Sequence, residues 1–230
     1  MSVEDHITIN GFKHILFEQE VYSPEKILLK SESFYQKMDK RRSVREFSSK
    51  PVSKTIIGNL IKTASTAPSG AHKQPWTFCA ISNPKIKSEI RKAAEIEEKE
   101  SYESRMSDSW LKDLAHLGTD YNKPFLEIAP WLIVIFKKAF EYDEKGEKIN
   151  NYYVNESVGL ASGMLITAIH NAGLVTLTHT PSPMRFLSKI LNRPDNERPF
   201  LLLPVGYAKD PTYVPDLKRK NINDIAEFYE

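Results

Sequence analysis

The sequence predicts a layered domain of helices and a sheet, of the α/β or α+β class, and three observations lead to this prediction. The length of 230 residues fits one domain, or one domain with arms. A hydrophobic content of 40% with 27% charged residues is ordinary for a globular protein with a full core. Helical patterns alternate along the chain with short apolar segments typical of strands, as they do in layered folds.

Helices are expected where capping residues precede periodic apolar positions. Residues 23–42 open with a serine cap followed by Pro24. In 53–65, apolar side chains recur on one face at helical spacing. Residues 83–100 begin with Asn and Pro and are mostly polar, while 155–173 has an Asn cap and a Gly stop. Strands are expected at the segments rich in β-branched and aromatic residues, which are 76–81, 131–136, 174–178 and 200–208.

The helix expected at 155–173 is nearly apolar all round, which is typical of a buried helix. It also carries small residues that let another backbone come close: Gly159, Ala161, Ser162 and Gly163. This helix is therefore either the central helix of one domain or a surface that packs against its copy in a dimer.

Charge, cysteine content and hydropathy exclude several classes of protein. A formal net charge of +2 is too small for a nucleic-acid footprint, and one cysteine, Cys79, makes neither an internal disulfide nor a cysteine metal cluster. The apolar runs fall far short of the roughly 20 residues that span a bilayer, and the N-terminus lacks the apolar region of a signal peptide. No GxGxxG, Walker A, HExxH or GxSxG motif occurs. We expect a cytoplasmic protein with no metal site, no nucleic-acid partner and no membrane segment.

Three stretches carry side chains suited to ligand binding. In "RRSVREF" (41–47), an extended or turn conformation would let arginines fork around a phosphate, although a basic helix C-terminus gives the same pattern. "APSGAHKQPW" (67–76) lies between an expected helix and an expected strand, as either a plain connector or a cradle for a ligand. "VPDLKRK" (214–220) is either a second cluster of basic residues that could bind a ligand or a solvated tail.

The order of several motifs resembles the FMN-dependent nitroreductase superfamily over about residues 38–220. They are "RRSVREFS", "LIKTASTAPSGAHKQPWTF", "HNAGLVTLTHTP", "LLLPVGYAKD" and "VPDLKRK". Within the superfamily, residues 97–136, which begin "EEKESYESRMSDSW", resemble the substrate lid of the iodotyrosine deiodinases. The resemblance implies an α+β fold with three layers (α/β/α), a mixed and mostly antiparallel sheet flanked by helices, and an intertwined homodimer with FMN in its interface.

The resemblance also implies roles for individual residues. The predicted cofactor contacts are Arg41, Arg42, Ser43, Val44, Arg45, Pro68, Ser69, Gly70, Thr178, His179, Thr180 and Arg219. Thr180 and Thr178 match the segment that faces flavin N5 and are the predicted catalytic residues. The backbone amide of Ala71 matches the group that meets a substrate phenolate. His179 stands where the animal enzymes carry a third threonine, so either Thr180 serves N5 or His179 faces the ring.

The lid residues Glu98, Tyr102 and Lys123 match the trio that holds an amino acid, and their chemistry suits this role. A zwitterion needs an anion for its ammonium and a cation for its carboxylate, and Glu98 and Lys123 provide one each. Glu98 and Tyr102 are four residues apart and share one helical face. A solvated acidic helix would give the same local pattern.

The whole chain, 1–230, is expected to form one FMN-binding domain with an N-terminal arm (1–22), a substrate lid at about 97–123 and a C-terminal arm (209–230). The implied reaction is reductive dehalogenation of a halogenated tyrosine, with electrons from NAD(P)H directly or through a separate reductase. Two alternatives remain. One is a general NAD(P)H-dependent nitroreductase or quinone reductase, and the other is a non-catalytic protein that binds flavin or a tyrosine derivative.

Overall fold

The computed structural model describes residues 6–230, which divide into two compact units, up to Lys40 and Arg41–Glu230. The first unit holds a hairpin of β1 (His6–Ile9) and β2 (Phe12–Ile15), followed by helix α1 (Pro24–Asp39). The Ser23 hydroxyl accepts a hydrogen bond from the Lys26 amide and so caps α1, as the sequence predicts. The hairpin is absent from the sequence-based prediction.

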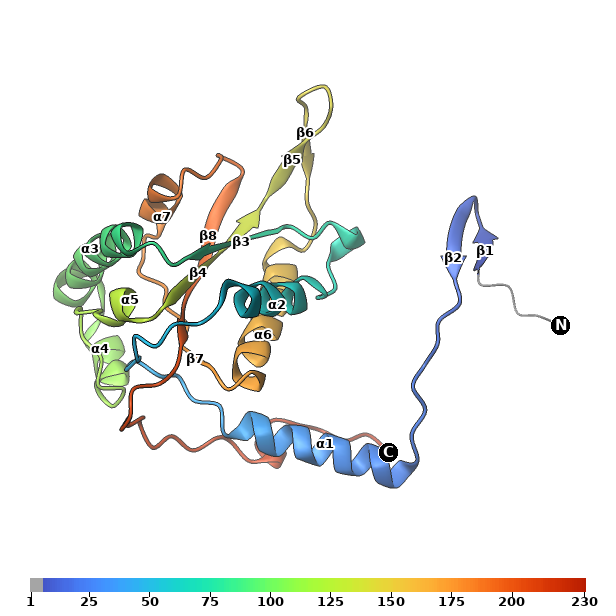
Figure 1. Ribbon diagram of the computed structural model, residues 1–230, viewed down its shortest axis with the longest axis horizontal. Helices are drawn as coiled ribbons and strands as arrows, with labels where there is room; N and C mark the ends of the chain where they lie inside the picture. The colour runs from blue at the N-terminus through green and yellow to red at the C-terminus, as the bar shows by residue number, and fades with distance from the viewer. Residues whose placement is uncertain (1–5) are drawn as a thin grey trace. The chain divides into compact units, whose positions relative to one another are not determined.

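The second unit contains a central antiparallel sheet with strand order β3-β4-β8-β7 (Figure 1). Its strands are β3 (Trp76–Ile81), β4 (Trp131–Lys138), β7 (Val175–Thr176) and β8 (Glu197–Gly206). In the register, Phe78 lies opposite Ile135, and Ile135 lies opposite Leu201. An isolated parallel bridge joins Ser43 to Thr176, which gives the sheet its mixed character. The predicted strand 174–178 is therefore wrong in length, because regular pairing with β8 stops at Thr176.

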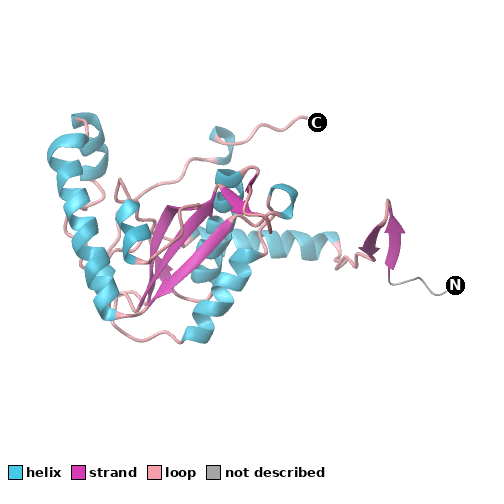
Figure 2. Cartoon of the chain, turned by 90° about the horizontal axis from the view of Figure 1, so that it is seen from above, coloured by secondary structure: helices cyan, strands magenta, loops and turns pink. Residues whose placement is uncertain are grey.

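Helices cover both faces of this sheet, so the three-layer prediction is confirmed (Figure 2). Each strand contributes side chains to both layers, because its successive side chains point to opposite faces of the sheet. Ile133, Ile135 and Leu203 pack under α2 (Lys54–Ser65) and α6 (Val154–Asn171). Leu132, Val134 and Leu202 pack on the other face, under α3 (Pro84–Glu100), α5 (Phe125–Ile128) and α7 (Arg185–Ile190).

Helix α6 is the buried helix that the sequence predicts, but only on one side. Val158, Ala161 and Leu165 are fully buried against the sheet. On the other side, Leu160 is 53% exposed, and a Cβ added at Gly159 or Gly163 would meet nothing within 4 Å. Gly159 and Gly163 therefore lie on an open face of the second unit, whereas Ala161 and Ser162 are buried.

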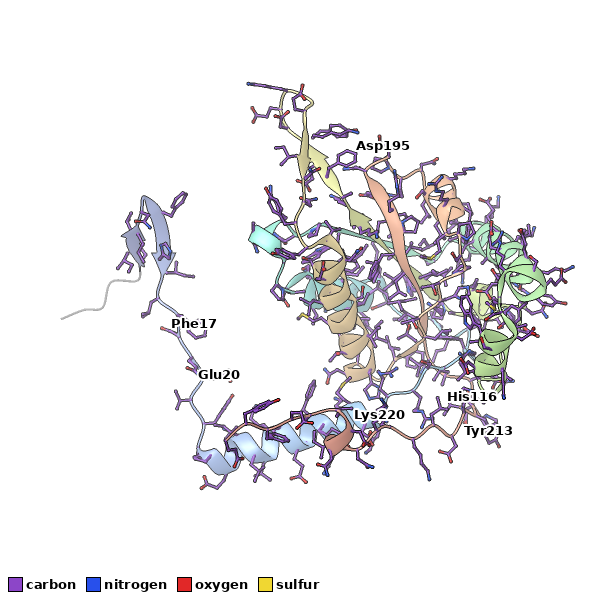
Figure 3. The ribbon with its side chains drawn as sticks, turned by 180° about the vertical axis from the view of Figure 1, so that it is seen from behind. Phe17, Glu20, His116, Asp195, Tyr213 and Lys220 are labelled. Atoms are coloured by element: carbon purple, nitrogen blue, oxygen red, sulfur yellow. The ribbon has the colours of Figure 1, made fainter. Side chains whose placement is uncertain are left out.

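Smaller elements connect these layers. A π-helical turn, Ser101–Arg105, continues α3 and is followed by α4 (Asp108–Ala115). A hairpin of β5 (Phe140–Tyr142) and β6 (Lys148–Asn150) follows β4. Asp195, just before β8, lies beside this hairpin, with its carboxylate oxygens 3.4 Å from the Tyr142 hydroxyl (Figure 3). No helix within residues 6–230 is long and apolar enough to cross a membrane.

Candidate active site

A basic cavity of about 550 Å³ opens in the second unit. Its cationic lining residues are Arg41, Arg42, Arg45, Lys218 and Arg219. The remaining wall includes Ser43, Thr178 and four leucines, which are Leu114, Leu117, Leu177 and Leu217. The segment at Tyr213 and the end of α4 near His116 come together on this side of the molecule (Figure 3). None of the described lining residues is acidic, so the cavity is suited to an anion.

The arginines reach the cavity from an extended segment, not from a helix. Helix α1 ends at Asp39, so the alternative of a basic helix C-terminus for 41–47 is wrong. The Val44 amide donates to the Thr176 carbonyl at 3.2 Å, and the Val44 side chain is buried. Because alternate residues of an extended chain face opposite sides, the neighbours Ser43 and Arg45 line the cavity. Val44 therefore anchors the segment through its backbone and its buried side chain.

Positive charge in this cavity is concentrated and partly desolvated. Burial lowers the pKa of Arg41, and repulsion from Arg219 and Arg42 lowers it further. The Arg219 guanidinium donates to the Arg41 carbonyl at 2.9 Å, and the Arg42 guanidinium donates to the Pro215 carbonyl. These contacts fix the arginines without cancelling their charge. A dianionic phosphate would accept hydrogen bonds from such a cluster and offset the repulsion.

The lid residues Glu98, Tyr102 and Lys123 come together in a second, buried cluster. The Lys123 ammonium lies 3.3 Å from Glu98 Oε2, with side chains that are 5% and 12% exposed. It also donates to Thr119 Oγ1 at 3.2 Å and to the Asp120 carbonyl. The Tyr102 hydroxyl donates to the Thr119 carbonyl at 3.2 Å. The alternative of a solvated acidic helix is therefore wrong for Glu98.

Local structure explains how a residue 25 positions away meets Glu98. The π-helical turn carries Tyr102 at the end of α3, and the chain then returns through α4. The Lys123 amide donates to Glu95 Oε1 of α3 at 2.7 Å. Lys87, also on α3, donates at 2.8 Å to the carbonyls of Glu127 and Ala129, at the end of α5. Helix α5 is thereby held on α3, with Lys123 just before it.

Burial sets the protonation behaviour of the cluster. Burial lowers the pKa of Lys123, and the adjacent Glu98 carboxylate opposes that shift. Burial raises the pKa of Tyr102, so its hydroxyl remains a neutral donor. Arg45 belongs to the basic cavity but interacts electrostatically with both Tyr102 and Lys123. The lid cluster and the basic cavity are therefore neighbouring parts of one site.

The segment Thr178–Thr180 presents alternate side chains to opposite sides. Thr178 lines the cavity and is exposed, as is Thr180. His179 is 6% exposed, lies edge-on to Phe125, and has Nδ1 3.8 Å from Glu98 Oε1. Of the two possibilities for this segment, the structure therefore favours a threonine on the cavity side, with His179 pointing toward the lid cluster.

The loop with Pro68, Ser69, Gly70 and Ala71 is not brought to the arginines within one chain. Trp76, just after this loop, pairs with Lys137 at one end of β4, whereas Thr176 pairs with Val205 beside the other end. The Ser69 hydroxyl accepts from the Gln74 amide at 2.9 Å, and the Gly70 amide donates to Ser157 Oγ at 3.3 Å. A Cβ at Gly70 would lie 2.9 Å from the Tyr152 carbonyl oxygen, so the close approach requires glycine.

Sequence reasoning missed several residues of the site. Leu114, at the end of α4, and Leu117, in the turn that follows, line the cavity. Thr119 and Asp120 accept hydrogen bonds from Tyr102 and Lys123. No sequence motif marks these two acceptor residues.

Comparisons with known proteins agree with this architecture. Residues 38–207 match the model of the nitroreductase family. An iodotyrosine deiodinase of Haliscomenobacter hydrossis is 62% identical over 208 residues, covering 90% of this chain and 94% of that protein. One of Daphnia pulex is 48% identical, covering 94% of this chain and 72% of that protein.

Among solved structures, an oxidized iodotyrosine deiodinase bound to FMN and 3-iodo-L-tyrosine superimposes with a TM-score of 0.72. It is 32% identical, and the match covers 86% of this chain and 99% of that one. The chain belongs to the nitroreductase family and, within that family, to the iodotyrosine deiodinases.

Proposed function

We propose that the protein is an FMN-dependent oxidoreductase that removes iodide from iodotyrosine. The observation that carries this proposal is the buried group of one anion, one cation and one phenol, Glu98, Lys123 and Tyr102, beside a cavity that fits an anionic cofactor. In the reaction, the aryl carbon–iodine bond breaks, iodide leaves, and the ring takes up two electrons and a proton. The likeness to iodotyrosine deiodinases over most of both chains supports the same assignment.

The basic cavity fits FMN because its donors suit a phosphate and its walls include apolar surface. Arg41, Arg42, Ser43, Arg45 and Arg219 would hold the cofactor, with Thr178 and Thr180 at the edge of its ring. FMN, when bound, supplies the reducing electrons for the reaction. The protein contributes binding, orientation and electrostatics, so no side-chain nucleophile is needed.

The lid cluster would hold the amino-acid end of the substrate. Glu98 would bind the ammonium and Lys123 the carboxylate, with Tyr102 donating beside them. In the structure Glu98 and Lys123 form an ion pair with each other. A zwitterion entering between them would replace one ion pair with two, so binding need not leave a buried charge uncompensated. Residues 97–123 would then close over the ring and exclude water.

A homodimer would complete the site. The amide of Ala71 is proposed to meet the phenolate oxygen, and Pro68, Ser69 and Gly70 to contact the cofactor ring. In one chain their loop lies by the opposite end of β4 from Thr176. The open face of α6, with Gly159, Leu160 and Gly163, supplies a surface for a second copy. The loop of one subunit would thereby contact the cofactor that the arginines of the other subunit hold.

Electrons would come from NAD(P)H, directly or through a separate reductase. A general nitroreductase would share the cofactor contacts but would not need Glu98, Tyr102 and Lys123 together. The two functions therefore differ in their dependence on Glu98.

Glu98→Gln tests this difference, because it removes the charge that would bind the ammonium and keeps the size of the side chain. We expect kcat/KM for 3-iodotyrosine to fall at least about tenfold, since hydrogen bonds to charged groups contribute about 1.5–3 kcal/mol. Reduction of a nitroarene by the same protein should be unchanged. Glu103→Gln, at a position 62% exposed on the next turn, is the matched control. Equal losses on both substrates would favour a general nitroreductase.

A further inference from the structure

His179 is a buried histidine that neither cofactor binding nor substrate binding, as proposed above, accounts for. Its backbone exchanges two hydrogen bonds with Leu202, at 2.9 and 3.1 Å, so the residue is tied to the sheet. Its ring centroid lies 5.6 Å from that of Phe125, at an interplanar angle of 88°. The backbone bonds fix the position of the main chain, and the buried ring packs edge-on against Phe125. A buried ring packed in this way can orient a polar neighbour.

The neighbour that it can orient is Glu98. Nδ1 of His179 lies 3.8 Å from Oε1 of Glu98, while Lys123 lies against Oε2 of the same carboxylate. Each carboxylate oxygen therefore has its own neighbouring nitrogen. The separation at Oε1 is longer than an ideal hydrogen bond, as is common in binding sites before the ligand arrives.

The tautomer of His179 follows from the two ring nitrogens. Nε2 is fully buried and has no hydrogen-bond partner among the described residues. A neutral ring with its proton on Nε2 would bury an unsatisfied donor and point the Nδ1 lone pair at a carboxylate. With the proton on Nδ1, the N–H points toward Glu98 and only an acceptor is left without a partner. The second arrangement has the lower energy.

The ring also stays uncharged. Burial lowers the pKa of His179 from its usual 6.5 to about 3, and the positive charges of Lys123 and Arg45 act in the same direction. A cationic histidine here would compete with a ligand ammonium for Glu98. A neutral ring with its proton on Nδ1 points a donor at the carboxylate and leaves the negative charge available to the ligand.

We propose that His179 is a positioning residue, which in its neutral Nδ1–H form orients Glu98 and so makes the site select ligands that carry an ammonium group. This inference rests on the proposed function, because it assigns the ammonium to Glu98. It concerns the geometry of the carboxylate and requires no contact between His179 and the substrate or the cofactor.

Two variants of nearly equal size test the proposal. In His179→Asn, the amide nitrogen lies as many bonds from the backbone as Nδ1 and can donate to Glu98. His179→Leu has the same shape as Asn but no donor. Both leave a similar cavity beside Phe125, so a purely structural role of His179 would affect both alike.

The ligands are 3-iodotyrosine, 3-iodotyramine, which lacks only the carboxylate, and 3-(3-iodo-4-hydroxyphenyl)propionate, which lacks only the ammonium. Their Kd values are measured on the oxidized FMN-loaded protein by quenching of flavin fluorescence. For His179→Leu we expect Kd to rise about tenfold for the two ammonium ligands and to stay unchanged for the propionate. His179→Asn should remain within about threefold of wild type for all three ligands.

Losses that are equal in Asn and Leu, or equal for all three ligands, would overturn the positioning role. So would an unchanged Kd in His179→Leu. A failure of the wild-type protein to bind 3-iodotyrosine is a different result, because it would overturn the proposed function and the inference with it.

Discussion

At the scale of single residues, the site depends on polar groups that are buried beside their partners. Lys123 is 4% exposed and His179 is 6% exposed, yet neither stands on a regular apolar pattern in the sequence. The spacing of four between Glu98 and Tyr102 predicts a shared helical face, and both residues do reach one cluster. The contribution of Lys123 depends on a chain reversal, and that of His179 on which side of an extended segment is buried. Neither the chain reversal nor the buried side of that segment can be predicted from local sequence patterns.

His179 should make the stability of the protein depend on pH in a predictable direction. Its pKa is about 3 in the native state and near 6.5 in the unfolded chain, so between these values the unfolded state binds the extra proton. Stability is therefore lost as the pH falls from about 6.5 toward 3. Between pH 7 and pH 5, the loss from this group should be about 2 kcal/mol.

Urea unfolding of wild type and His179→Leu at both pH values, at one FMN concentration, measures this effect. The free energy of unfolding of wild type should fall by about 2 kcal/mol more than that of the variant, because other titrating groups are common to both. The same pH dependence in both proteins would show that His179 is not held neutral by burial.

At the scale of elements, the capped helices and the well-paired strands could be predicted, and the short elements could not. Ser53 and Asn83 cap α2 and α3 through hydrogen bonds to the first-turn amides. Strand β3 has the predicted bounds, 76–81. The π-helical turn at 101–105 and α5 make contacts with distant residues, Arg105 with the Ser182 carbonyl and Lys87 with the end of α5, so local sequence carries little signal for them.

The open face of α6 leads to a prediction about this helix. Glycine in a helix is less stable than alanine by about 1 kcal/mol, so a larger side chain at Gly163 would stabilise a lone chain, where it meets no atoms. If that face packs against a second copy, Gly163→Lys should instead separate the dimer and reduce FMN retention. Light scattering coupled to size-exclusion chromatography measures the oligomeric state, and the flavin absorbance of the eluted peak measures FMN retention.

Glu89→Lys, on the exposed side of α3, serves as the control for an added positive charge. An intact dimer with a higher Tm in Gly163→Lys would show that α6 faces solvent in the assembled protein.

At the scale of the whole molecule, the layers could be predicted but the relation between distant motifs could not. Alternation of helices with short strands indicates a layered domain, the family resemblance implies a sheet between two helical layers, and the structure has this arrangement. The distance between the loop at Ser69 and the arginines depends on strand order and register, which the sequence does not state. The stretch 38–207, which includes Arg41, Arg45 and Ser69, nonetheless matches one family model.

The central claim is that the lid cluster holds the zwitterion of an iodinated tyrosine against the flavin site. The most direct measurement is titration of the FMN-loaded protein with 3-iodotyrosine, followed by flavin fluorescence, for wild type and Lys123→Gln. Wild type should show saturable quenching, and Lys123→Gln should bind at least about tenfold more weakly, because it loses the cation for the carboxylate. Absence of quenching in wild type at millimolar 3-iodotyrosine, or equal Kd values in the two proteins, would contradict the account.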